Sequence, residues 1–212
     1  QRGGRVVVID PTVLASLPRR HLCAGLAEAA KVGFALDARL VALLERDAGR
    51  LSQGGSGARR ALHDVVVRAV AAKARLVQAD ERDAGRRQLL NYGHTVGHAL
   101  ELLGGYRRWV HGEAVALGMA VEARIAIRLG LLAAGTADRQ SRLLAALGLP
   151  NPARSLAGVS ARKAFNAMQL DKKKSAGELR FVLTEGVGVA SFGHHVKRAE
   201  VIAALQDAGC EP

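Results

Sequence analysis

The sequence predicts a mainly α-helical bundle domain with a small C-terminal β-hairpin. Three observations lead to this fold class. Hydrophobic residues make up 49% of the 212-residue chain but aromatic residues only 3%, so Ala, Leu and Val must fill the core, which favours closely packed helices. Apolar residues recur at helical spacing over most of the chain. Strand-like runs, by contrast, are short and few.

The chain is expected to enter the bundle through a connector. Residues 5–9 form a β-branched run that ends at Asp10-Pro11, which is typical of a strand or connector that passes from one layer to another. Apolar spacing then predicts a helix over residues 19–35. Asp37 is placed to cap a second helix directly after it.

Glycine-rich and polar breaks divide the middle of the chain. The Gly/Ser segment 52–57 separates the second helix from a long helix over residues 58–78. A polar loop over 80–85 leads to what is predicted as one helix through residues 89–102. Gly104-Gly105 ends that helix.

The C-terminal half continues with helices and one hairpin. Gly148 and Pro150 stop one of the helices, and Gly186 separates two short runs of strand-forming residues. The helices are expected at residues 111–132, 137–147, 161–170 and 197–208, and the hairpin strands at 179–183 and 187–192.

Composition narrows the class of partner. Lys and Arg number 31 against 19 acidic residues, a net charge of +12, which suits nucleic acid, an acidic membrane surface or a small anionic substrate. Cys23 and Cys210 are isolated, so no disulfide framework or cysteine-based zinc site is expected, and a reducing, cytoplasmic compartment is favoured. The apolar runs are shorter than a signal peptide or the ~20 residues of a bilayer span require, so no membrane partner is expected.

Three histidines are candidates for a metal site, although the HxxxH spacing alone fits structural or surface histidines equally well. His94 and His98 are i,i+4 neighbours, so their imidazoles leave one helix face. Thr95 stands where an HExxH zinc protease motif needs Glu, which excludes that class. His111 opens the next helix after a short turn and can approach His94. Two imidazoles and one carboxylate would complete a catalytic-type divalent metal site.

Glu28 is the candidate carboxylate, because it lies among small apolar residues in Gly25–Lys31. A buried carboxylate is costly, and a metal removes that cost. A simple surface ion pair between Glu28 and Lys31 explains the segment equally well. Lys73, Arg87 and the Lys172–Lys173 pair are ordinary surface cations on the same reasoning.

Four segments together resemble 3-dehydroquinate synthase, an enzyme family of the shikimate pathway. They are GLAEAAK at 25–31, LLNYGHTVGHALE at 89–101, HGEAVALGM at 111–119 and LDKKKSAGELRFVL at 170–183, in the order found in the family. The resemblance covers nearly the whole chain but only the C-terminal half of a family member. It implies that residues 1–18 are the last strand and connector from a missing NAD-binding domain. Residues 19–212 would then be the helical domain that binds metal and substrate.

The resemblance also implies roles for individual residues. Glu28, His94 and His111 would hold Zn²⁺ or Co²⁺. The remaining matched residues would contact an anionic sugar-acid phosphate, an interaction that calls for cations and hydrogen-bond donors. Those given catalytic roles are Lys31, Asn91 and His98, and those given substrate-binding roles are Lys73, Asp83, Arg87, Lys172 and Lys173. Asp83 departs from the family's usual Glu, and Lys174 obscures which lysine of the run contacts substrate.

In the family, the enzyme oxidises a secondary alcohol of 3-deoxy-D-arabino-heptulosonate 7-phosphate with NAD, eliminates phosphate, reduces the ketone again and closes the ring by an aldol step. The resemblance implies this lyase reaction, with the chain's own N-terminal NAD domain as partner and a homodimer at full length. We find no GxGxxG between a strand and a helix to cradle NAD here, so the fragment alone is expected to be inactive.

Other interpretations are open on the sequence alone. A related cyclase that makes amino-dehydroquinate shares the metal site. His63-Asp64 supplies the dipeptide of an HD-type phosphohydrolase, but within a valine-rich helix face. A basic nucleic-acid-binding domain fits the net charge but lacks interleaved aromatic residues and any recognised motif, so no nucleic-acid partner is expected.

Overall fold

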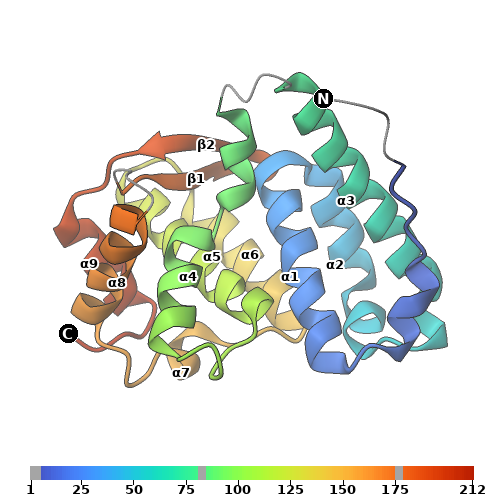
Figure 1. Ribbon diagram of the computed structural model, residues 1–212, viewed down its shortest axis with the longest axis horizontal. Coiled ribbons are helices and arrows are strands. Elements are labelled where there is room, and N and C mark those ends of the chain that lie inside the picture. Colours follow the sequence, from blue (N-terminus) through green and yellow to red (C-terminus); the bar gives the residue numbers. More distant parts are fainter. Residues whose placement is uncertain (1–5, 81–84, 175–178) are drawn as a thin grey trace.

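The protein is a bundle of helices with one β-hairpin, as predicted (Figure 1). The structure is a computed structural model that describes residues 6–80, 85–174 and 179–212, without the side chains of 171–174. Its elements are η1 (Pro11–Ser16), α1 (Arg19–Leu36), α2 (Ala38–Gln53), η2 (Ser56–Ala58), α3 (Arg59–Ala79), η3 (Arg86–Asn91), α4 (His94–Leu103), α5 (His111–Arg128), α6 (Ala134–Ala146), α7 (Pro152–Ser155), α8 (Ala161–Lys174), β1 (Phe181–Gly186), β2 (Val189–His194) and α9 (Arg198–Asp207).

The buried apolar residues form two hydrophobic cores. The first core joins α1, α2, α3 and α6, and the second joins α4, α8, α9 and the C-terminal residues. Helix α5 lies between them and contributes to both, with Val115 and Met119 in the first core and Leu117 and Val121 in the second. Figure 1 shows α1, α2 and α3 side by side on one side of the molecule and α8 and α9 on the other. Helices α4 and α5 lie between these two groups.

The helix predicted over residues 89–102 is wrong as a single element. The chain forms the short 3-10 helix η3, turns at Tyr92-Gly93, and then starts α4 at His94. Gly93 has φ of 80°, a left-handed conformation that most residues avoid, and a Cβ there would lie 2.7 Å from the carbonyl oxygen of Val115. The apolar spacing continues across the turn, which is why the sequence did not reveal the break.

Elsewhere the helices lie close to their predicted positions. Asp37 caps α2 as expected, because its Oδ1 accepts hydrogen bonds from the backbone N–H groups of Arg39 and Leu40. Helix α7 was not predicted. It is a single turn started by the Asn151 side chain and Pro152.

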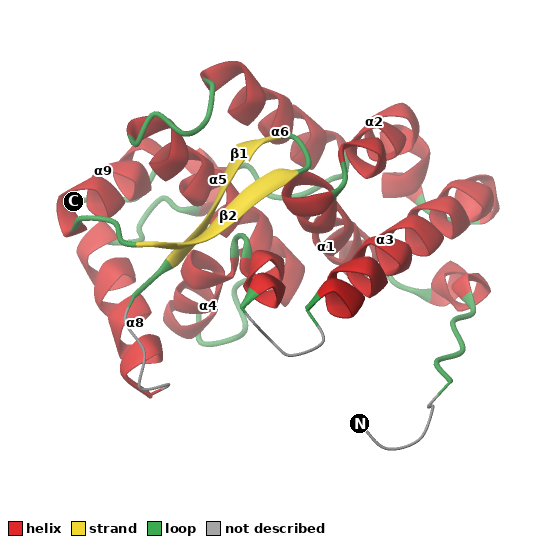
Figure 2. Cartoon of the chain, turned by 90° about the horizontal axis from the view of Figure 1, so that it is seen from above, coloured by secondary structure: helices red, strands yellow, loops and turns green. Residues whose placement is uncertain are grey.

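The hairpin crosses the bundle over the junction between the two cores (Figure 2). Its strands are antiparallel, with Leu183 opposite Ser191. Because side chains alternate along a strand, Val182 packs into the first core while Phe181 and Leu183 pack into the second. The backbone N–H of Gly188, at the turn, donates to the carbonyl oxygen of Phe34 at the end of α1. The hairpin therefore ties α1 to the opposite half of the bundle.

The N-terminal segment has no partner strand among the described residues. Residues 6–10 have no regular secondary structure, and Val6 and Val8 are each 87% exposed. A strand needs a hydrogen-bonded neighbour, so the predicted strand is not formed among the described residues. The assignment of 1–18 as strand and connector from another domain stays a prediction.

Two expectations from composition can be compared with the structure. Cys23 and Cys210 are both buried and free, as expected. Within the described part of the chain, no helix is long and apolar enough to span a bilayer.

Candidate metal centre

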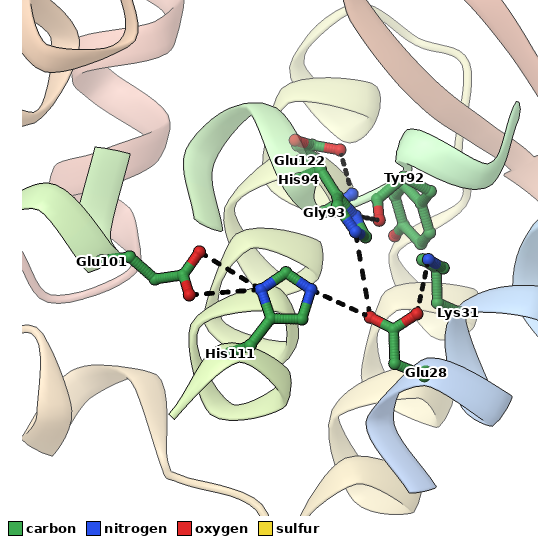
Figure 3. Close-up of polar contacts among 8 residues, drawn as sticks. All are labelled: Glu28, Lys31, Tyr92, Gly93, His94, Glu101, His111 and Glu122. Atoms are coloured by element: carbon green, nitrogen blue, oxygen red, sulfur yellow. Dashed lines mark hydrogen bonds and ion pairs between the residues drawn. The ribbon is translucent and has the colours of Figure 1, made fainter. Parts of the chain in front are cut away.

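Three segments distant in sequence bring Glu28, His94 and His111 together (Figure 3). Glu28 comes from the middle of α1, His94 from the first residue of α4 and His111 from the first residue of α5. One ligand atom from each lies within 4.8 Å of the others, and the His94 and His111 ring centroids are 5.3 Å apart. The predicted convergence of these three side chains is confirmed.

Glycines allow the helices to approach this closely. Gly112, next to His111, packs against the backbone of Ala24 on α1, where a Cβ would overlap the Ala24 carbonyl oxygen. Gly118, further along α5, packs in the same way against the carbonyl oxygen of Gly93. Any side chain at either position would push α5 away from a neighbouring helix that carries a candidate ligand.

The imidazole of His94 is held with one nitrogen facing Glu28. Its Nδ1 lies 3.2 Å from the carbonyl oxygen of Tyr92, which can only accept, so Nδ1 carries the proton. Its Nε2 then presents a lone pair 3.9 Å from Oε1 of Glu28. Burial and the Lys31 charge lower the pKa of His94 to about 4, so this imidazole is neutral near pH 7 and available as a ligand.

His111 is oriented by a carboxylate. Its Nδ1 lies 3.2 Å from both carboxylate oxygens of Glu101, and its Nε2 lies 3.6 Å from Oε1 of Glu28. Metal-bound histidines commonly donate their second N–H to such a group, which fixes the tautomer and makes the ring a stronger ligand. Both histidines therefore direct Nε2 toward the same carboxylate oxygen (Figure 3).

Glu28 and Lys31 form the ion pair that the sequence left as an alternative, but not on the surface. Lys31 is only 3% exposed, and its Nζ donates to Oε2 of Glu28 over 2.7 Å. Burial opposes ionisation of Glu28, yet the Lys31 charge and hydrogen bond keep the pKa of Glu28 below its ordinary value. Burial, and secondarily Lys73, lowers the pKa of Lys31, while Glu28 opposes that shift.

The other carboxylate oxygen of Glu28, Oε1, indicates a site for a cation. Oε1 is buried and has no hydrogen-bond partner, although two imidazole nitrogens face it. An unsatisfied buried carboxylate oxygen is costly, and a divalent cation between it and the two Nε2 atoms would remove that cost. Two neutral imidazoles and one carboxylate are a donor set that suits Zn²⁺ or Co²⁺. The residues present therefore fit the implied metal.

A second donor set overlaps the first. His98, Glu101 and His111 also offer ligand atoms within 4.8 Å of one another. In that set, however, Glu101 already accepts from His111, and His98 is exposed. We favour the first set, because its carboxylate oxygen is the one without a hydrogen-bond partner.

Some of the other predicted site residues lie near the candidate metal centre, and others lie outside the described residues. Lys73 lines a pocket together with Glu28 and lowers the pKa of Lys31 by its charge. His98 is exposed, with its ring centroid 5.4 Å from that of His94, and Asn91 is exposed at the end of η3. Arg87 is half-buried, and its backbone N–H donates to Asp80. Asp83 and the side chains of Lys172 and Lys173 lie outside the described residues.

Sequence reasoning missed Glu101, Tyr92 and Glu122, which surround the candidate ligands. Glu101 lies at i+3 from His98, a spacing that places both on one helix face and could have revealed it. Glu122 is an acid amid small apolar residues, the same pattern that singled out Glu28. The contact of the Tyr92 carbonyl with His94 could not be predicted from residue type, because every residue carries a backbone carbonyl.

The histidine-aspartate dipeptide is separate from this centre. His63 and Asp64 contact each other at 3.4 Å on α3, where their side chains are 60% and 44% exposed. Among the described residues, neither belongs to a group of three candidate metal ligands. The phosphohydrolase interpretation therefore gains nothing from their geometry.

Comparison with known proteins gives one consistent family. A family profile described as 3-dehydroquinate synthase C-terminal matches residues 25–174. The 3-dehydroquinate synthase of Synechococcus sp. strain CC9605 is 42% identical over 95% of this chain and 53% of its own length. That of Rhodospirillum rubrum is 43% identical over 96% of this chain and 53% of its own length. The chain thus spans about half the length of the curated relatives it matches.

Two solved structures share the fold. A 2-epi-5-epi-valiolone synthase from Streptomyces hygroscopicus subsp. jinggangensis 5008, solved with NAD⁺ and Zn²⁺ bound, matches with a TM-score of 0.81 and 30% identity. The match covers 94% of this chain and 54% of that chain. A 2-deoxy-scyllo-inosose synthase matches with a TM-score of 0.76 over 93% of this chain and 54% of that chain, and its 23% identity supports the fold alone.

Proposed function

Because this chain belongs to the 3-dehydroquinate synthase C-terminal family, we propose that it is the metal- and substrate-binding domain of a 3-dehydroquinate synthase. The complete protein would convert 3-deoxy-D-arabino-heptulosonate 7-phosphate to 3-dehydroquinate and phosphate. The observation that carries the proposal is the buried Oε1 of Glu28, which lacks a hydrogen-bond partner and faces the Nε2 atoms of two oriented histidines.

Glu28, His94 and His111 would hold the metal, Zn²⁺ or Co²⁺. When bound, such an ion polarises substrate oxygens and lowers the pKa of a coordinated alcohol. The tautomers held by Tyr92 and Glu101 keep both Nε2 lone pairs directed at one point, so the protein does not need to reorganise its ligands. The valiolone synthase solved with Zn²⁺ supports this choice of metal.

The cations around the centre would bind the substrate's anionic groups. Lys31 is buried and already holds Oε2 of Glu28, so its ammonium keeps the carboxylate ionised and can donate further hydrogen bonds. Lys73 lines a pocket together with Glu28, and its charge acts on Lys31, so a phosphate or carboxylate there would find a second positive charge. We assign His98 and Asn91, both exposed near His94, to the substrate's hydroxyl groups. Arg87, Asp83 and the Lys172–Lys173 pair keep the substrate-binding roles predicted above.

NAD would be bound mainly by a separate N-terminal domain. The strands among the described residues form only an antiparallel hairpin, so these residues offer no strand, glycine-rich turn and helix to cradle a dinucleotide. A hydride acceptor is essential to the first step, and no side chain can replace it. A homodimer at full length and a cytoplasmic location are further predictions of this proposal.

Metal titration of the purified chain tests the centre directly. We expect one tight Zn²⁺ or Co²⁺ site per chain, measured by competition with a chromophoric chelator. His94→Ala should weaken binding on the order of a thousandfold, beyond the 10–100-fold typical of residues that only orient ligands. His63→Ala removes an exposed histidine on α3 and should change nothing. Equal affinities in wild type and His94→Ala would contradict the assignment.

Reconstitution tests the reaction. The chain alone, supplied with Zn²⁺ and NAD, should release no phosphate from the heptulosonate phosphate, whereas addition of the NAD-binding half of a relative should restore release. Turnover by the chain alone would refute the proposed division of labour. Preference of the reconstituted enzyme for an amino analogue of the substrate would instead identify an amino-dehydroquinate synthase.

A further inference from the structure

We propose that Glu122 is a positioning residue of the metal centre, which fixes the turn from which His94 emerges. The inference rests on the proposed function, because it assumes that His94 is a metal ligand. Glu122 lies on α5, is fully buried, and belongs to neither candidate donor set. Figure 3 shows Glu122 above the His94 imidazole, on the side away from Glu28.

The carboxylate of Glu122 caps α4 from a different helix. Its Oε2 accepts from the backbone N–H of Gly93 over 2.6 Å, and its Oε1 accepts from that of Val96 over 3.4 Å. Gly93 occupies the N-cap position of α4 but has no side chain to satisfy the first N–H groups. A carboxylate at a helix N-terminus also interacts favourably with the helix dipole. Glu122 therefore does for α4 what Asp37 does for α2 within its own segment.

This cap controls the orientation of His94 because the two are adjacent in the chain. Gly93 lies in the chain between Tyr92 and His94. The carbonyl oxygen of Tyr92 accepts the hydrogen bond from His94 Nδ1. The Tyr92 hydroxyl is anchored separately, since it donates to Oε1 of Gln140 over 2.7 Å. The Tyr92 hydroxyl also lies 3.3 Å from the carbonyl oxygen of Met119 on α5. The side chain of Tyr92 is thus held by α6 and α5 and the backbone of Gly93 by α5, and the carbonyl that sets the His94 tautomer lies between these two anchors.

Helix α5 then positions both histidine ligands. His111 is its first residue, and Glu122 follows eleven residues later, about three helical turns, so both lie on one face. Val115 and Gly118, on the same stretch, contact Gly93. The helix presents His111 directly and holds His94 through Glu122. Movement of α4 against α5 would change the distance between the two Nε2 atoms.

The test compares metal binding by wild type, Glu122→Gln and Glu122→Asp. The glutamine variant keeps the size of the side chain but removes its charge, and the aspartate variant keeps the charge but shortens the reach. We expect each variant to bind Zn²⁺ about tenfold more weakly, the lower end of the range for residues outside the ligand set. The Co²⁺ d–d absorption spectrum, which reports coordination geometry, should also change. Far-UV circular dichroism at the titration temperature establishes that each variant is folded.

Asp37→Asn is the matched control, since Asp37 is also a buried capping carboxylate but lies at the start of α2. It should lower the melting temperature and leave both Zn²⁺ affinity and the Co²⁺ spectrum unchanged. The inference is overturned if folded Glu122 variants keep wild-type affinity and spectrum. If Glu122→Gln does not fold, Glu122→Asp decides by the same criteria. Failure of wild type itself to bind metal would instead refute the proposed function.

Discussion

The two hydrophobic cores supply different halves of the candidate metal centre. The first core, around α1, α2 and α3, supplies the carboxylate of Glu28 and the ammonium of Lys31. The second, around α4, α8 and α9, supplies the first-turn imidazole of His94, and α5 contributes His111 from between the two. Neither core by itself contains a complete donor set that includes Glu28. The centre therefore depends on how closely the two halves approach.

The contacts that set this approach differ on the two sides of α5. On the first-core side, Gly112 packs against Ala24 of α1, one turn before Glu28. On the second-core side, Gly118 packs against Gly93, next to His94. A glycine inside a helix is unfavourable by roughly 0.5–1 kcal/mol relative to Ala, so both positions are explained by close packing rather than by helix propensity.

The largest expected effect comes from replacing either of these two glycines of α5 by alanine. Gly112→Ala and Gly118→Ala should each lower the free energy of unfolding by about 3 kcal/mol, because backbone rather than a flexible side chain occupies the space of the new methyl group. Gly112→Ala should separate Glu28 from His111, and Gly118→Ala should separate His94 from His111. Both should weaken metal binding, measured by chelator competition alongside urea unfolding.

Two other helical glycines serve as controls for this prediction. A Cβ at Gly49 on α2 or at Gly135 on α6 would meet nothing within 4 Å. Replacement of either by Ala should leave metal affinity unchanged and stabilise the fold by about 0.5–1 kcal/mol. Similar destabilisation at all four positions would show that the approach to α5 is not special.

The next largest expected effect is the contribution of Asp37, a residue of the first-core side, to the stability of the fold. Asp37 is buried, caps α2, and accepts a hydrogen bond from Arg68 of α3 over 2.9 Å. Burial opposes ionisation, but Arg68 and the backbone donors lower the pKa of Asp37 below its ordinary value of 3.8. Its stabilising contribution is therefore present above about pH 4 and is lost as pH falls through the lowered pKa.

Asp37→Asn should consequently destabilise the protein by about 1–2 kcal/mol at pH 7, measured by urea unfolding. The difference from wild type should shrink below pH 4, where wild-type Asp37 also becomes neutral. A difference that stays constant down to pH 2.5 would mean that the ion pair contributes nothing beyond the cap.

The smallest expected effect is that of the Lys31 ammonium, supplied by α1, on the affinity of the centre for metal. The Lys31 ammonium competes with a metal ion for Glu28 and repels any cation bound there. Lys31→Met should therefore raise Zn²⁺ affinity about fivefold, or about 1 kcal/mol, the order expected for one nearby charge. Lys197→Met, an exposed cation before α9, should leave the affinity unchanged. Weaker Zn²⁺ binding in Lys31→Met would show that Lys31 instead supports the ligand geometry.

Much of the fold, and the candidate metal ligands, could be predicted from the sequence. Helix positions follow from apolar spacing and caps, both of which are local properties, and Asp37 illustrates this at the start of α2. The three candidate ligands were predicted because His and Glu are common metal donors and because the family resemblance implies that role for them. The turn at Tyr92-Gly93 was not predicted, because the same apolar pattern continues through it.

Tertiary structure alone decided the state of those ligands. The sequence could not distinguish a surface ion pair between Glu28 and Lys31 from a buried metal ligand. The structure shows a buried Lys31 paired with a half-buried Glu28, one oxygen of which is unsatisfied. The tautomers of His94 and His111 depend on a carbonyl and a carboxylate brought within 3.2 Å by folding. Periodicity specifies which face of a helix is buried, whereas the distance and register between two helices depend on the residues of both, such as Gly118 against Gly93.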